Sequence, residues 1–367
     1  LPYALSAALS TIFPSIYVDV QLVLAAPLAR SAAPQLGRNG LAMLGGALTA
    51  GILVGYVFVV PGLGVISIAG LLHIPLGTML LYGAPIGLIT AVLTTFIYGR
   101  VLRLGFWNED KDEHVSEALR EEEALADREA EQRATDGADA GGPAAPARGL
   151  PSLGVSLLPV IVPLLLIAFG AIASAAGFSN PVIAFFGDPN LALFIGLLGA
   201  YVLAKRSLGS DRTDEALNKG FNTTGQILLV TGVGGSLGAV IEATSLDKEL
   251  GGLFSAEAGA PVLLSILLAW FIAALLHLAI GSISVAAITA AGILGPIMGE
   301  IDAPTVIIGL AIGAGALFAL QVNSNFFWMF QTLLGVSTRG ALKALTFVTA
   351  LASVVSLPLI GLLSLVV

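Results

Sequence analysis

A short polar stretch, Gln321-Val322-Asn323-Ser324-Asn325, interrupts one of the most apolar regions of the chain. In hydrocarbon, an amide or hydroxyl without a hydrogen-bond partner costs several kcal/mol, so a helix that faces lipid would not carry this stretch. We expect the backbone to leave the helix here and to line a polar cavity. Under this interpretation the stretch binds a hydrophilic solute through the side chains of Gln321, Asn323, Ser324 and Asn325. A hydrogen-bonded cluster between helices is the alternative.

Glycine and small hydroxyl residues dominate a second candidate stretch, from His277 to Gly292. The hydroxyls of Ser282 and Thr289, together with the free N–H groups of a re-entrant helix, would hold an anionic group. Close packing between helices is the alternative for these small residues. His277 can change its charge between about pH 5 and 8, which makes it a candidate for ion coupling. A neutral packing role is the alternative for this side chain.

Asp19 and Gly62 are the candidates from the first part of the chain. Asp19 lies in an apolar run, and an acid in such a run indicates a role in binding substrate, a cation or a proton. An acid at a helix end, at the membrane surface, is the alternative. Gly62 belongs to the helix-breaking sequence from Pro61 to Gly64, because proline removes a backbone donor. This sequence predicts a second interruption beside the substrate.

The composition assigns the whole chain to the membrane. Of its 367 residues, 56% are hydrophobic and 11% are charged, whereas a soluble domain carries about 25% charged residues. Apolar runs of roughly 20 residues, enough to cross the ~30 Å hydrocarbon core as a helix, recur along the sequence. They predict an all-α polytopic membrane protein with spans near 41–60, 80–103, 153–177, 190–204, 222–243, 260–280, 303–320 and 341–366. Shorter, broken helices are expected near 1–33, 61–76, 281–299 and 321–335.

A charged segment divides the chain into a first membrane half, 1–105, a linker, 106–150, and a second membrane half, 151–367. The linker is charged and then rich in Ala, Gly and Pro, so it cannot bury a core of its own; an exposed helix is expected near 113–133. Lys and Arg cluster in 205–220 and are absent from 177–190. Because short cytoplasmic loops concentrate basic residues, we predict that 205–220 and the linker are cytoplasmic and that 177–190 is external.

The two membrane halves resemble each other at two places. The segment 13–29 parallels 281–298, and 59–83 parallels 320–344, which sets two helix-breaking sequences opposite each other. Many transporters are built from inverted repeats whose discontinuous helices meet at the substrate site, so we expect repeated halves with inverted topology. The first half has fewer residues ahead of its repeat unit than the second half has. The sequence therefore suggests that further membrane segments precede Leu1.

Several function classes find no support in the sequence. With no Cys and only three His, neither a metal site nor another cofactor is expected. The glycine-rich segment 232–251 resembles a dinucleotide-binding pattern, but it lies in a predicted span and does not follow a strand of a βαβ unit. A hinged or broken membrane helix is the better interpretation. His277 and Ser282 lack an orienting acid, so an enzyme is not expected, and neither is a nucleic-acid partner.

At four motifs the sequence resembles the gluconate permease family of proton-coupled symporters, within the larger ion-transporter superfamily. The resemblance covers the chain from about Phe13 onward and rests on VDVQLVLAAPL, GVGGSLGAVIEATSLDK, GSISVAAITAAGILGPI and VNSNFFWMF. The last two motifs are the most specific. The resemblance implies that Asp19 stands at the family's acidic position and that Val322 and Asn323 form its Val-Asn pair. It also implies membrane segments ahead of those in this chain.

The chain departs from the family pattern at residues of the candidate sites. The family has His and the second Pro of His-Pro-Gly-Pro where this chain has Val60 and Leu63, and His and Asp where it has Gln321 and Ser324. It has Arg where this chain has His277. The loss of a fixed positive charge and of two imidazoles weakens the case for gluconate itself and for proton coupling, so a related small carboxylate is the expected solute.

These features predict a secondary active transporter, in the plasma membrane of a prokaryote, for a small organic anion such as gluconate or a related sugar acid or hydroxycarboxylate. Symport with a proton is the favoured coupling. A sodium-coupled carboxylate transporter and a cation/proton antiporter that uses Asp19 are the alternatives, while a channel and an intramembrane enzyme are disfavoured. The expected partners are the organic anion, a proton or sodium ion and membrane lipid. Homo-oligomerisation is left open.

Overall fold

The computed structural model describes residues 1–114, 151–175, 178, 180–243 and 262–367. In these residues all regular structure is helical, apart from one isolated bridge between Glu113 and Val336. The predicted fold class, an all-α polytopic membrane protein, is confirmed. Five helical stretches in the described ranges are long and apolar enough to cross a membrane: Gly40–Leu71, Leu76–Arg103, Pro189–Leu208, Val262–Ile280 and Thr338–Leu363.

The first half packs around one central helix, α3 (Gly40–Phe58), in which nearly every residue is buried. Its helical hydrogen bonding stops shortly before Pro61, which has no N–H to donate, and the chain restarts as α4 (Leu63–Leu71). The predicted interruption near Gly62 is therefore present, with Gly62 as the residue before α4. The other elements of this half are α1 (Pro2–Thr11), α2 (Val18–Ala32), the 3-10 helix η1 (Ala33–Leu36), α5 (Leu76–Arg103) and α6 (Glu109–Asp112).

The second half also has a buried central helix, α15 (Thr305–Ala316), which is buried along almost its whole length. The chain leaves the helix after Ala316 and restarts as α16 (Asn325–Leu334), so the polar stretch from Gln321 lies in a helix break, as predicted. The other elements are α8 (Leu153–Ala175), α9 (Pro181–Phe186), α10 (Pro189–Leu208), α11 (Ser210–Ala243), α13 (Val262–Ile280), α14 (Ile283–Leu294), the 3-10 helix η3 (Gly295–Glu300), α17 (Thr338–Ala341), the π-helical η4 (Leu342–Thr346) and α18 (Phe347–Leu363).

One predicted loop is wrong. The segment 205–220 is not a loop, because α10 continues to Leu208 and α11 begins at Ser210, with only Gly209 (φ 87°) between them. Lys, Arg, Ala and Leu in this segment favour a helix. The span expected over 303–320 is present as α15 and ends at Ala316. Beyond His114, the exposed helix expected near 113–133 lies outside the described residues. The first part of the glycine-rich segment 232–251 belongs to α11, and its end lies outside the described residues.

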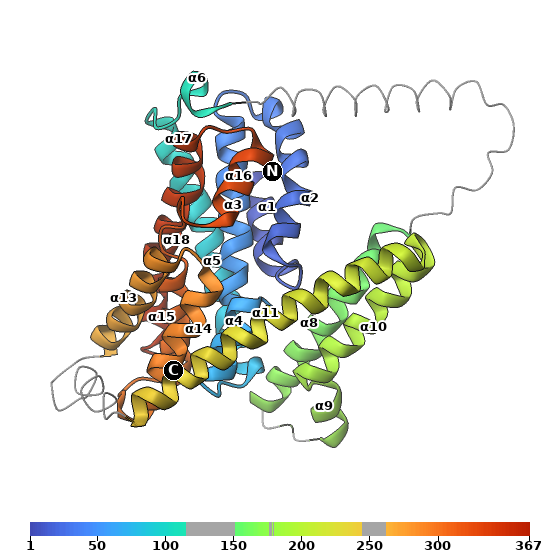
Figure 1. Ribbon diagram of the computed structural model, residues 1–367, viewed down its shortest axis with the longest axis vertical. Coiled ribbons are helices and arrows are strands. Elements are labelled where there is room, and N and C mark those ends of the chain that lie inside the picture. Colours follow the sequence, from blue (N-terminus) through green and yellow to red (C-terminus); the bar gives the residue numbers. More distant parts are fainter. Residues whose placement is uncertain (115–150, 176–177, 179, 244–261) are drawn as a thin grey trace, which may run out of the picture.

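Helices α1–α5 and α13–α18 form one bundle, and α8, α9 and α10 stand beside it (Figure 1). The long α11 runs from α10 across to the bundle, where it contacts α14 and η3. The series α2, η1, α3, break, α4 matches the series α14, η3, α15, break, α16 in element order. In addition, α4 packs on α14 and α16 packs on α2. The predicted repeat, its inverted relation and the re-entrant character of α2 and α14 stay predictions.

The first residues of the predicted linker fold onto the second membrane half. The Asp112 carboxylate is fully buried and pairs with Arg339 at 3.0 Å and with Lys343 at 2.5 Å. Farther along, the N–H of His114 donates to the carbonyl of Gly335 at 2.8 Å. The described part of the linker is thus attached to α17 and its preceding loop. The division of the chain into three parts stays a prediction.

Candidate functional site

A cavity of about 310 Å³ brings together residues from both halves of the chain. Three helices, α2, α14 and α16, contribute the residues at their N-terminal ends, and α3 contributes one wall. The volume lies at the small end of the range of about 300–1,000 Å³ that is typical of ligand sites. The lining residues are Tyr17, Val18, Asp19, Leu53, Tyr56, Gly281, Ser282, Ile283, Ser284, Leu320, Ser324, Asn325 and Phe326.

The backbone at these three helix N-termini is suited to an anion. The first N–H groups of a helix have no partner inside the helix, and the helix dipole adds a partial positive charge there. Tyr17 and Ser324, which precede α2 and α16, do not cap their helices with their side chains. Ser282, which precedes α14, accepts a long hydrogen bond of 3.4 Å from the N–H of Val285. Convergent N-termini of this kind can hold a carboxylate or phosphate.

A tight contact at Gly281 holds two of the convergent segments together. Gly281 has φ 77°, and a Cβ atom there would lie 2.6 Å from the carbonyl oxygen of Asn323. Only glycine fits both the left-handed conformation and the close approach. The Asn323 amide in turn donates to the carbonyl of Leu278 at 3.0 Å. The end of α13 and the break before α16 are therefore fixed against each other beside the cavity.

Side chains with different hydrogen-bonding capacity line the cavity, among them Asp19, Ser282, Ser284, Ser324 and Asn325. A hydroxyl both donates and accepts, an amide does the same through separate atoms, and a carboxylate only accepts. The set therefore matches a solute that carries hydroxyl or amino groups as well as an acid. The apolar wall of Leu53, Phe326 and the Tyr56 ring would exclude water from the far side.

Asp19 occupies the first turn of α2, next to the other lining residues. The positive end of the helix dipole stabilises a carboxylate at this position. In a cavity of about 310 Å³, however, an ionised Asp19 and an anionic solute would repel each other. Joint occupancy is favoured when a proton or a metal cation neutralises one of the two negative charges.

The remaining predicted residues lie outside the cavity lining. Asn323 is exposed next to Gly281, and Gln321 is partly exposed in the same helix break. Thr289 lies farther along α14, and Gly62 packs at the other helix break, where a Cβ would lie 2.6 Å from the carbonyl oxygen of Tyr56. Their roles in substrate binding stay predictions.

His277 does not line the cavity either. Its side chain is 1% exposed, and Nδ1 donates to the carbonyl oxygen of Phe318 at 2.9 Å. Nε2 is buried, and no residue in the described ranges hydrogen bonds to it. The histidine thus ties the end of α13 to the start of the break between α15 and α16. Its predicted part in ion coupling stays a prediction.

Sequence reasoning missed Tyr17 and Tyr56 as lining residues. Ser284, which belongs to the hydroxyl-rich candidate stretch from His277 to Gly292, lines the cavity as well. Tyr56 is a single phenol in the apolar sequence of α3, where it looks like a packing residue. Only the three-dimensional fold places it beside Ser284.

Comparison with known proteins also indicates a permease. An uncharacterized permease of Haemophilus influenzae is 30% identical over 336 residues, which cover 88% of this chain and 64% of the relative. The high-affinity gluconate transporter of Escherichia coli is 28% identical over 349 residues, 94% of this chain and 73% of the relative. A D-serine transporter of Escherichia coli is 29% identical over 364 residues, 96% of this chain and 74% of the relative.

The chain therefore spans less than two thirds of the Haemophilus influenzae relative and about three quarters of the other two. No solved structure matches the chain. The model of the GntP family permeases matches residues 3–366, nearly the whole chain. The resemblance noted at the motifs is thereby confirmed, and with it a multi-pass protein of a prokaryotic inner membrane. The chain belongs to the GntP permease family.

Proposed function

We propose that the chain forms the substrate-binding part of a secondary transporter for a small organic acid with hydroxyl or amino groups near its carboxylate. The observation that carries the proposal is the convergence of three helix N-termini on one cavity with Asp19, Ser282 and Ser324. Two relatives are named for gluconate and D-serine, which share a carboxylate next to a carbon with a polar substituent. The family is one of permeases, so no enzymatic activity is proposed.

In this proposal the carboxylate of the solute binds the free backbone N–H groups at the start of α14 and α16. The Ser282 and Ser324 hydroxyls and the Asn325 amide bind the polar groups that follow along the solute. Asn323 and Gln321 lie in the same helix break. They would contribute to binding through the shape of this break and through their exposed polar groups. The polar character of the solute would then decide affinity, because buried polar groups that lose their partner are costly.

Coupling follows from the repulsion between Asp19 and an anionic solute. A proton taken up by Asp19 from the outer side removes that repulsion, so the anion and the proton enter together. Release of the proton on the inner side restores the negative charge and expels the anion. Sodium at the same carboxylate would serve the same purpose, and a cation/proton antiporter would use Asp19 without an anion.

Uptake into proteoliposomes that contain the full-length protein tests the proposal. Labelled gluconate, other hydroxy acids and D-serine are offered, with a pH gradient and a sodium gradient imposed separately. We expect accumulation of at least one acid in response to the pH gradient. Accumulation driven by sodium alone would transfer the coupling to sodium, and exchange of cations without any organic acid would establish the antiporter.

Asp19→Asn separates binding from coupling. It should abolish gradient-driven accumulation but retain exchange of internal for external substrate, because an amide is neutral in both steps. Asp302→Asn is the matched control, since Asp302 is exposed in the turn before α15 and lies outside the cavity lining. Normal accumulation by the Asp19→Asn protein would exclude Asp19 as the coupling residue.

A further inference from the structure

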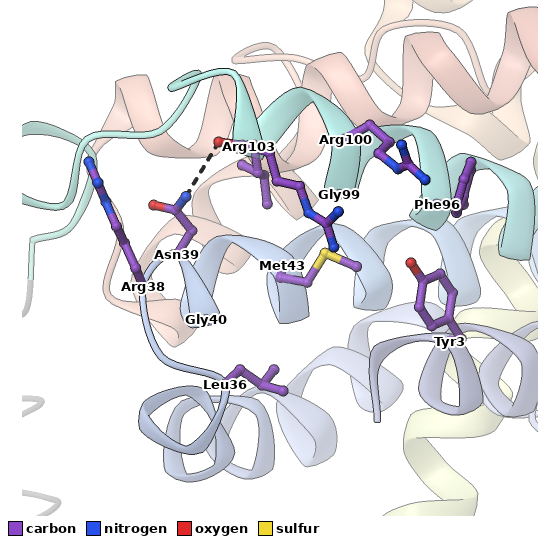
Figure 2. A pocket seen from close by; sticks show the side chains of 11 residues that line it. Tyr3, Leu36, Arg38, Asn39, Gly40, Met43, Phe96, Gly99, Arg100 and Arg103 are labelled. Atoms are coloured by element: carbon purple, nitrogen blue, oxygen red, sulfur yellow. Dashed lines mark hydrogen bonds between the residues drawn. The ribbon is translucent and has the colours of Figure 1, made fainter.

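A second cavity, of about 320 Å³, lies at the other end of α3, between the start of this helix and the end of α5 (Figure 2). Its lining includes three arginines from two places in the sequence. Arg38 precedes α3, and Arg100 and Arg103 lie in the last turn of α5. The cavity shares no lining residue with the substrate cavity.

The three guanidinium groups have no acidic partner in the part of the chain that the structure describes. Each of the three arginine side chains is exposed. The ion pairs of the described residues join Asp112 to Arg339 and Lys343 instead. Arg100 lies over the Phe96 ring, 4.8 Å from its centroid, which holds the side chain without neutralising it. Arg100 and Arg103 lie on the same side of the cavity, while Arg38 extends on the far side of Asn39 (Figure 2). Unpaired guanidinium groups along one cavity suit an anion that accepts several hydrogen bonds, such as a phosphate.

The position of the cavity along α5 indicates where this anion comes from. This helix is one of the five candidate membrane spans, and its last turn is the level at which the chain leaves the membrane. The headgroups of phospholipids lie at this level. Basic pockets between membrane helices at this level are known to hold anionic headgroups.

One face of α5 adds a track for acyl chains. Ile89, Leu93 and Phe96 follow one another at helical spacing of three or four residues, and each is more than a third exposed. The same spacing continues to Arg100 and Arg103. An apolar face that ends in arginines matches a molecule with a charged head and apolar tails, and free phosphate would use only the arginines.

The interior of the cavity has room for a headgroup. In Figure 2 the Arg103 side chain extends over Met43, and the hydroxyl of Tyr3 points towards the side where Arg100 and Arg103 lie. A Cβ atom at Gly99 would lie 3.3 Å from the sulfur of Met43, so Met43 packs closely on this glycine and forms the floor beside it. Tyr3 would donate a further hydrogen bond to the phosphate or its glycerol.

We propose that this cavity binds the headgroup of an anionic phospholipid, with the acyl chains along Ile89, Leu93 and Phe96 of α5. The lipid belongs to the membrane leaflet on the side of the linker. The bound lipid would connect the end of α5 to the start of α3. Both of these helix ends lie near α6. The site is independent of the proposed substrate site.

Native mass spectrometry of the full-length protein in detergent, with phosphatidylglycerol or phosphatidylcholine added, tests the proposal. A variant with Arg38→Gln, Arg100→Gln and Arg103→Gln should bind phosphatidylglycerol roughly 100-fold more weakly, about fivefold for each arginine. Binding of phosphatidylcholine should be the same for both proteins. The matched control carries Lys205→Gln, Arg206→Gln and Arg212→Gln, three exposed cations of α10 and α11, and should bind phosphatidylglycerol like the unchanged protein.

Three results would overturn the proposal. An equal loss of phosphatidylglycerol binding in the two triple variants would mean that binding depends on the overall charge of the protein and not on this cavity. Equal protection against thermal unfolding by inorganic phosphate and by phosphatidylglycerol would mean a site for a free anion. A changed oligomeric state with unchanged lipid binding would mean an interface between copies. If the triple variant does not fold, Arg38→Gln alone replaces it, because Arg38 is exposed ahead of α3, and a fivefold loss is then expected.

Discussion

Ser324 and Asn323 are neighbours in sequence but have different surroundings. Ser324 lines the cavity and has no hydrogen bond from its side chain to its own helix. Ser324→Ala therefore removes a hydroxyl that is available to the solute. A lost hydrogen bond to a charged group is worth about 1.5–3 kcal/mol, so KM should rise roughly 10- to 150-fold with an unchanged melting temperature. Transport kinetics and thermal unfolding of the same purified sample measure both.

Asn323→Ala is the informative comparison. Because the Asn323 amide donates to Leu278 across the break, its loss should lower the melting temperature as well as the affinity. A Ser324→Ala protein with normal kinetics would show that the hydroxyl does not face the solute. A less stable Asn323→Ala protein with normal KM would reduce Asn323 to a packing residue.

The contact of Gly281 with Asn323 predicts a second effect at the residue scale. Gly281→Ala should destabilise the protein and lower transport, because an alanine there is strained at φ 77° and its Cβ would meet the Asn323 carbonyl. Gly105→Ala is the matched control, since Gly105 has φ 83° but no neighbour within 4 Å. Strain without collision should cost about 1–2 kcal/mol, so thermal unfolding should separate the two variants. Equal melting temperatures would mean that the break moves easily away from α13.

Among the elements, α6 is joined to α17 and η4 by the ion pairs of one buried carboxylate. Asp112 is fully buried, the Arg339 side chain is 57% exposed and the Lys343 side chain is 14% exposed. Removing one partner of a buried pair costs about 3–5 kcal/mol, and Asp112→Asn leaves the mostly buried Lys343 without its carboxylate. Thermal unfolding should therefore show a clear loss of stability for Asp112→Asn.

The control for this pair is Asp110→Asn, in the same helix but with an exposed side chain. It should leave the melting temperature unchanged. The α17 end of the pair follows shortly after α16, whose N-terminus lines the cavity that contains Asp19. Loosening the ion pair should thus also reduce the maximal transport rate. Full stability of the Asp112→Asn protein would show that the contact between α6 and α17 carries no energy.

At the scale of the whole molecule, the sequence predicted the helices and the breaks because both follow from local chemistry. Apolar runs gave α3, α5 and α13, and Pro61 and the polar stretch at Gln321 gave the interruptions. Asp19, Ser282, Ser324 and Asn325 were identified one by one, as polar groups in apolar surroundings. All four line a single cavity.

The parts that the sequence could not predict depend on how helices rotate and pack. Tyr56 lines the cavity although its own neighbours are apolar. Thr289 and His277 lie outside the lining although they, too, are polar side chains in apolar runs. Asp112 is one of many acids in a charged segment. Nothing in the neighbouring sequence distinguishes it from the other acids, although it is buried and pairs with Arg339 and Lys343, which are distant in sequence.

The membrane orientation follows from the distribution of basic residues and predicts different labelling at two positions. The chain has no Cys, so single cysteines at Ser179 and Ser210 can be labelled in intact cells with a reagent that does not cross membranes. We expect the reagent to label the cysteine at position 179 only, because the basic residues around Ser210 mark the cytoplasmic side. Permeabilised cells, in which both cysteines should react, provide the control. Labelling of Ser210 in intact cells would contradict the orientation.

The linker divides at His114 into a part that packs on the membrane domain and a part whose composition cannot form a core. Replacing residues 116–149 with a Gly-Ser sequence of equal length should leave melting temperature and transport unchanged, because charged and Ala-, Gly- and Pro-rich sequence buries little apolar surface. Replacing 109–114 in the same way should lower the melting temperature, because it removes the ion pair of Asp112 and the hydrogen bond from the Asn39 N–H to Glu109. Both variants keep the chain length and the flanking spans. A loss of stability in the first variant would mean that 116–149 contacts the membrane domain, and unchanged stability in the second would mean that α6 is only adjacent to α17.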